Sequence, residues 1–80
     1  MTAKINCQVT DGLMPTEKVA RIETADGKSE EVAVSAQNIE GNQLKAFEIG
    51  RSDDKVLVEL PRESASGRWR VWVKASAVGG

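Results

Sequence analysis

The sequence predicts an all-β domain, an antiparallel meander of five or six strands around one small core. Short segments rich in β-branched residues alternate apolar and polar residues with a period of two, as strands with one buried face do. Turn glycines separate these segments: Gly12, Gly27, Gly41, Gly50 and Gly67. A chain of 80 residues has room for one domain, which we expect to span residues 1–78, with residues 79–80 as a loose tail.

The first strand is predicted at residues 4–9. Ile5, Cys7 and Val9 fall on one face of this strand, and the intervening polar residues fall on the other, so we expect it to be half-buried. Residues 10–12 then suit a turn, and residues 13–17, which include a proline, suit an irregular loop.

A β-hairpin is predicted next, because residues 18–24 and 30–35 flank a segment of turn residues. An odd-length loop centred on Gly27 would set Ile22 opposite Val32 and keep the apolar residues of both strands on one face. A two-residue loop would instead pair apolar residues with charged ones. We therefore expect the register with the odd-length loop.

Residues 29–50 fit either strands or short helices. Val32 and Val34 alternate as strand residues do, and so do Phe47 and Ile49. The apolar spacing also suits a short helix in each half of this stretch. Because short helices gain little stability on their own, we expect strands and keep the helices as the alternative.

The two clearest strands are predicted at residues 55–60 and 68–74. One antiparallel register satisfies both of their faces. Its inner face buries three pairs: Leu60 with Trp69, Val58 with Val71, and Val56 with Val73. Its outer face sets Glu59 opposite Arg70 and Leu57 opposite Trp72. The same counting across a turn at residues 50–54 sets Ile49 opposite Val56 and Phe47 opposite Val58, also on the inner face.

The end of the chain, Gly67-Arg68-Trp69-Arg70-Val71-Trp72-Val73-Lys74-Ala75-Ser76-Ala77-Val78, resembles the end of an SH3-like small barrel. In such barrels a strand rich in aromatic and aliphatic residues is followed by a tight helical turn and a closing apolar residue, here residues 74–77 and Val78. The resemblance covers the last third of the chain and implies a small closed β-barrel. This chain has no tyrosine and so lacks the groove of peptide-binding SH3 domains. The resemblance therefore implies a type of module without implying polyproline binding.

An outward pair, Leu57 and Trp72, is the first candidate site. Arg70 and Lys74 share this face with Trp72. Exposed aromatic residues with neighbouring arginines are typical anchors of protein interfaces, so we expect a protein partner or a second copy of the chain to bind here. The alternative is that the loop at residues 13–17 or the end of the chain covers Trp72.

A second candidate site is a nucleic-acid-binding stripe of Arg68, Arg70 and Lys74 around Trp72, in which a base would stack on the indole. The net charge of the chain is −1, which disfavours strong non-specific binding to nucleic acid. The charge is unevenly divided, since residues 1–40 carry four basic and seven acidic groups and residues 41–80 carry seven and five.

Several chemistries are disfavoured by composition. There is no histidine to act as a base, and Cys7 lies on an apolar face, so we expect a structural thiol and no catalytic activity. The carboxylate pairs Glu30-Glu31 and Asp53-Asp54 suit a strand and a turn, so we expect no metal and no cofactor. No apolar run is long enough for a membrane span or signal peptide, so we expect a cytoplasmic, non-enzymatic interaction module.

Overall fold

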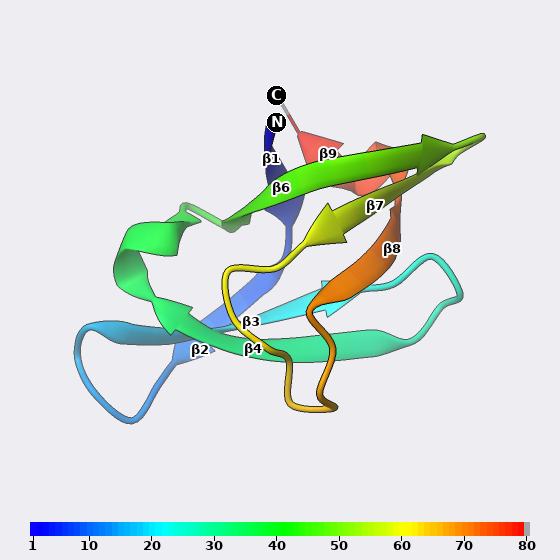
Figure 1. The fold of residues 1–80 in the computed structure, drawn as a ribbon. Coiled ribbons are helices and arrows are strands. Elements are labelled where there is room, and N and C mark those ends of the chain that lie inside the picture. The colour runs from blue at the N-terminus through cyan, green and yellow to red at the C-terminus, as the bar shows by residue number, and fades with distance from the viewer. Residues whose placement is uncertain (80) are drawn as a thin grey trace.

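The computed structural model describes residues 1–79, which form nine antiparallel strands and two single turns of 3-10 helix (Figure 1). In chain order the elements are β1 (Thr2–Asn6), β2 (Gln8–Asp11), β3 (Glu17–Glu23), β4 (Ser29–Ser35), η1 (Ala36–Asn38), β5 (Ile39–Glu40), β6 (Gln43–Ser52), β7 (Lys55–Glu59), β8 (Arg70–Lys74), η2 (Ala75–Ala77) and β9 (Val78–Gly79). The predicted all-β antiparallel class is confirmed. Residues 29–50 form strands and one 3-10 turn, so the helical alternative is wrong.

The strands form two sheets. A six-stranded sheet has the order β8-β7-β6-β1-β9, with β5 beside β6, and a three-stranded sheet has the order β2-β3-β4. The predicted first strand is divided between them, because β1 pairs with β6 and β9 whereas β2, after Cys7, pairs with β3 (Figure 1). Within residues 1–79 neither sheet closes on itself, so a closed barrel is not confirmed.

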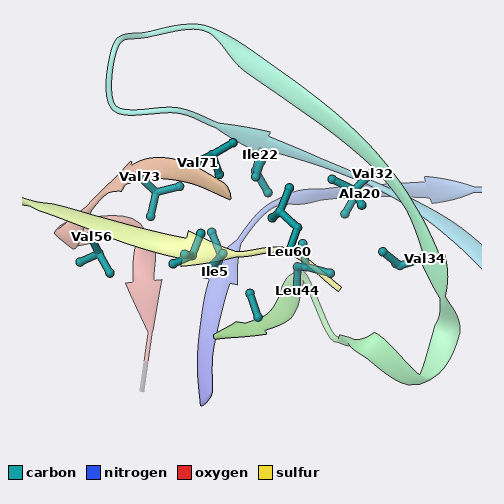
Figure 2. Packing of buried hydrophobic residues seen from close by; sticks show 12 residues of the cluster. Ile5, Ala20, Ile22, Val32, Val34, Leu44, Val56, Leu60, Val71 and Val73 are labelled. Carbon is teal, nitrogen blue, oxygen red and sulfur yellow. The ribbon is translucent and has the colours of Figure 1, made fainter. Parts of the chain in front are cut away.

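The inner faces of the two sheets share one apolar core (Figure 2). Ile22 and Val32 enter it from the three-stranded sheet, and Leu44 and Val58 enter it from the six-stranded sheet. All four side chains are fully buried. Each sheet thus has its apolar inner face covered by the other, which is the condition for an independent small β-domain.

The predicted register of β7 with β8 is confirmed, with Val56 opposite Val73, Val58 opposite Val71 and Leu57 opposite Trp72. The prediction that Trp69 is buried is wrong, since 54% of it is exposed. Its carbonyl still accepts a 2.8 Å hydrogen bond from the Leu60 amide. Regular strand geometry begins only at the next residue, so the alternation that would turn this indole inward does not apply to it.

The predicted register of β6 with β7 is wrong. The strands continue to a tight turn at Asp53-Asp54, and a β-bulge then inserts one extra residue near Ile49. Because of the bulge Phe47 lies opposite Glu59 on the outer face, and a one-residue slip of this kind moves a side chain from one face to the other. Phe47 and Ile49 are accordingly 53% and 43% exposed instead of buried.

The β3–β4 hairpin keeps its apolar residues on one face, but its register differs by two residues from the prediction. Ala20, rather than Ile22, lies opposite Val32. The loop is shorter than expected, because the Thr24 amide donates to the Lys28 carbonyl at 2.8 Å. Gly27 takes the left-handed conformation, with φ at 85°, that such three-residue hairpin loops require.

The chain's last described residue, Gly79, lies in β9 opposite Lys4, so the fold extends beyond the expected boundary at residue 78. Of the expected loose tail, Gly80 lies outside the described residues. In residues 1–79 no helix has both the length and the apolar character that crossing a membrane requires.

Candidate interaction face

The outer face of β6, β7 and β8, hereafter the outer face, carries a group of accessible apolar side chains. Leu57 and Trp72 lie directly opposite each other, as the register of β7 and β8 requires. Phe47 and Ile49 of β6 are also exposed to solvent. Gly50 of β6 lies opposite Leu57 of β7, so β6 places no side chain directly beside Leu57.

Trp72 is 38% exposed, so its indole is partly packed and partly accessible. The Lys55 ammonium lies 5.4 Å from the centre of the ring, in cation–π geometry. The backbone carbonyl of Trp72 accepts a 2.8 Å hydrogen bond from Ala25, at the tip of the β3–β4 hairpin. The loop at residues 13–17 lies at the start of β3, whereas Ala25, which bonds to the Trp72 backbone, follows the end of β3, so the loop lies far from Trp72 along the three-stranded sheet (Figure 1).

The cations of the predicted site fall into two groups. Arg70 and Lys74 flank Trp72 on β8, and the Arg70 guanidinium lies 3.2 Å from the Glu59 carboxylate, as the predicted register implies. Lys74 lies opposite Lys55 and has no ion pair within residues 1–79. Arg68 precedes β8, and its guanidinium lies 3.7 Å from Glu30 of β4. The predicted partner-binding residues therefore share one face, whereas Arg68 points towards the other sheet.

A hollow of about 240 Å³ lies beside Trp72, between β8 and the tip of the β3–β4 hairpin. Hairpin residues 24–26 and Lys28 line one side, and Lys55 and Arg68 line the other. Sequence reasoning missed this hollow, because it exists only where the hairpin tip meets β8. The misassigned hairpin register left no basis for placing Ala25 next to Trp72.

Two carboxylates border the hollow, and both are held ionised. Hydrogen bonds from the Thr24 hydroxyl and the Lys28 amide lower the pKa of Asp26. A 2.6 Å hydrogen bond from the Ser66 hydroxyl is the main cause that lowers the pKa of Glu30. Their negative charges thus already have partners within the chain.

The segment before β8, residues 62–67, is tied to the three-stranded sheet by hydrogen bonds. The Ala65 amide donates to the Glu31 carbonyl at 2.8 Å. Ser64 is buried, and its hydroxyl accepts a 3.0 Å hydrogen bond from the Arg68 amide. The sequence signal for such a closed turn is a glycine that follows two serines. In the structure this residue, Gly67, takes the left-handed conformation.

The remaining candidate residues, the cysteine and the carboxylate pairs, do not belong to the outer face. Cys7 is half-buried, burial raises the pKa of its thiol, and its Sγ lies 3.5 Å from the Asn42 carbonyl, so the thiolate is disfavoured. Glu31 is exposed on β4, whereas its neighbour Glu30 faces the hollow. In the part of the chain that the structure describes, no three side chains of the metal-binding types converge.

A scan against models of known protein families found no match for this chain, and searches of curated proteins and of solved structures found none either. Functional proposals for this chain therefore rest on its own burial, charge and contacts. The outer face is where exposed large apolar residues of the strands gather within residues 1–79.

Proposed function

We propose that this protein is a small non-enzymatic interaction module that binds a partner protein through the outer face. The observation that carries the proposal is the grouping of Phe47, Ile49 and Trp72, all exposed, with Leu57 on three adjacent strands. A domain of this size has little apolar area to spare, and exposed apolar groups of this kind mark interaction sites. Trp72 would be the central anchor, and Arg70 and Lys74 would orient the partner.

We also propose that the module is an SH3-like barrel. Two backbone hydrogen bonds support this proposal, from Ala25 to the Trp72 carbonyl and from Ala65 to the Glu31 carbonyl, both at 2.8 Å. They link the three-stranded sheet to β8 and to the segment before it. On the other side of the core the chain itself passes from β1 to β2. The two sheets are thus connected on both sides, as the sheets of a small barrel must be.

The partner segment combines apolar side chains with carboxylates. Lys55, Arg70 and Lys74 on the outer face outnumber Glu59, so the face is positively charged and two copies facing each other would repel. Leu57 and Ile49 are aliphatic and offer no ring for a base to stack on, so this part of the face suits a protein segment better than a nucleic acid.

The nucleic-acid alternative relies on Arg68, Arg70, Trp72 and Lys74. Two of its three cations already have carboxylate partners, Glu30 for Arg68 and Glu59 for Arg70. Phosphate contacts there would have to displace these carboxylates, and this is a second reason to favour the acidic protein segment.

Selection from a displayed library of random dodecapeptides tests the proposal. We expect enriched peptides to combine aromatic or aliphatic residues with Asp or Glu. Their affinity for Trp72→Ala should fall about 30-fold, because loss of a central anchor typically costs about 2 kcal/mol. Leu13→Ser is the matched control, since Leu13 is 98% exposed on the β2–β3 loop and should not affect peptide binding.

Thermal unfolding of both variants shows whether they are folded. If Trp72→Ala is unfolded, Lys74→Glu replaces it, because this exposed side chain has no ion pair in the described chain. Three outcomes would overturn the proposal: no enriched peptides, equal losses for Trp72→Ala and Leu13→Ser, or a dimer by sedimentation that Trp72→Ala dissociates. Salt-dependent binding of single-stranded RNA with no peptide binding would favour the nucleic-acid alternative.

A further inference from the structure

The hollow beside Trp72, hereafter the hairpin pocket, is too small for a drug-sized ligand, since its volume is about 240 Å³. It has room for a single side chain. We infer that the hairpin pocket binds a carboxylate, the acidic side chain of the segment that docks on the outer face. The identity of the partner rests on the proposed function, whereas the chemistry of the pocket rests on its own residues.

The carboxylates of the hairpin pocket stay charged, but each already has partners within the chain. Asp26 accepts hydrogen bonds from the Thr24 hydroxyl and, at 3.2 Å, from the Lys28 amide. Glu30 accepts one from Ser66 and lies 3.7 Å from the Arg68 guanidinium. Neither carboxylate therefore needs a cation from a ligand, which disfavours a lysine or arginine side chain as the occupant.

Two of the positively charged groups in the hairpin pocket have no ion-pair partner within residues 1–79. Lys28 and Lys55 both line it, and neither forms an ion pair within residues 1–79. The Lys55 ammonium is placed 5.4 Å from the Trp72 ring centre, beside an apolar wall. A carboxylate that enters here receives ammonium donors from two sides and lies partly shielded from water by the indole.

A monoanion fits the hairpin pocket better than a phosphate does. Asp26 and Glu30 remain ionised at its rim, although each has partners. Lys28 and Lys55 are the two pocket cations without an ion pair in the described chain, and two ammonium groups match the two oxygens of a carboxylate. A phosphate monoester has three such oxygens and close to two negative charges at neutral pH, and we expect repulsion from Asp26 and Glu30 to offset the stronger attraction of its second charge. This difference separates an acidic protein segment from a nucleic acid as the source of the anion.

Titration of the isotopically labelled protein with three small probes tests the inference by nuclear magnetic resonance. The probes are phenylacetate, its neutral amide phenylacetamide, and phenyl phosphate. We expect phenylacetate to shift the backbone amides of residues 24–28 and the Trp72 indole N–H. It should bind at least ten-fold more tightly than phenylacetamide and more tightly than phenyl phosphate. Added salt should weaken it, because the lysines are exposed.

The double variant Lys28→Gln with Lys55→Gln should weaken phenylacetate binding at least ten-fold. Lys45→Gln is the matched control, because Lys45 lies on β6 opposite Lys4, away from the hairpin pocket. Equal binding of phenylacetate and phenylacetamide, tighter binding of phenyl phosphate, or an equal loss in the control variant would each overturn the inference.

The two proposals fail separately. Enriched peptides that depend on Trp72, without any effect of phenylacetate on residues 24–28, would refute the carboxylate pocket and leave the outer face as the binding site. Phenylacetate binding that depends on Lys28 and Lys55, without any enriched peptide, would refute the proposed function and leave the pocket.

Discussion

The two sheets bury equally apolar inner faces but present different outer faces. On the three-stranded sheet the exposed strand positions are mainly polar or charged, such as Arg21, Glu23 and Glu31, and none of the described ones is a large apolar residue. On the six-stranded sheet Phe47 and Trp72 are exposed. The core is formed by the inner faces, so the difference between the outer faces is the basis for proposing the six-stranded sheet as the binding side of the molecule.

The largest effect on stability is expected for substitutions in the core, which test whether the two inner faces contribute equally to the free energy of unfolding. Ile22→Ala in the three-stranded sheet and Leu44→Ala in the six-stranded sheet should each lower the free energy of unfolding by about 3 kcal/mol, because both side chains are fully buried. Urea titration followed by tryptophan fluorescence measures this loss. Exposed Leu13→Ala should change stability by less than about 0.5 kcal/mol. A loss in only one sheet, or two separate transitions, would show that the sheets do not share one core.

A smaller effect tests the connection between the sheets. Glu30→Gln should lower the free energy of unfolding at pH 7 by about 1 kcal/mol, because it weakens the links to Ser66 and Arg68. The pKa of Glu30 is lowered in the folded state, so its contribution is fully present above the ordinary glutamate pKa and is lost as the pH falls through the lowered folded-state pKa.

The difference between the wild-type protein and Glu30→Gln should therefore shrink when urea titrations are repeated at pH 3. Glu31→Gln is the matched control, since this neighbouring side chain is exposed and forms no ion pair in residues 1–79. A difference that is as large at pH 3 as at pH 7 would contradict the role assigned to the ionised Glu30.

The smallest effect on stability is expected on the outer face. Phe47→Thr should cost less than about 1 kcal/mol, because the phenyl ring is 53% exposed and threonine suits a strand. The same variant should weaken the selected peptides several-fold. Calorimetric unfolding and peptide titration check the two effects. A stability loss above about 3 kcal/mol would instead place Phe47 in the core.

The accuracy of the sequence reasoning differed between the two β-hairpins of the six-stranded sheet. The β7–β8 register was predictable because its two faces independently require it, with valines pairing inside and Glu59 meeting Arg70 outside. The β6–β7 register was not, because the bulge near Ile49 adds a residue that no alternation pattern reveals. Phe47, which lies on the outer face, and Ile49, which lies at the bulge and is exposed, were therefore assigned to the core.

The rest of the site depends on tertiary contacts. The hairpin pocket exists because the Ala25 amide reaches the Trp72 carbonyl, and these residues are far apart in the sequence. The hydrogen bonds of Ser64 and Ser66 likewise tie the segment before β8 to itself and to β4. In the sequence these polar residues resemble those of an ordinary loop, because the strand that they bind, β4, is distant in the sequence.

The position of β1 has a consequence for the order of folding. This strand lies between β6 and β9, so its partners come from the middle and from the far end of the chain. The hairpins β3–β4, β6–β7 and β7–β8 are local and can form while the chain is being synthesised. The β1 strand can pair with β6 as soon as β6 has been synthesised, whereas its pairing with β9 must wait until β9 has left the ribosome. Because β1 continues into β2, which pairs with β3, docking of β1 on β6 joins the two sheets through the chain itself, and we expect the β1–β9 pair, whose strands are farthest apart in the sequence, to form last.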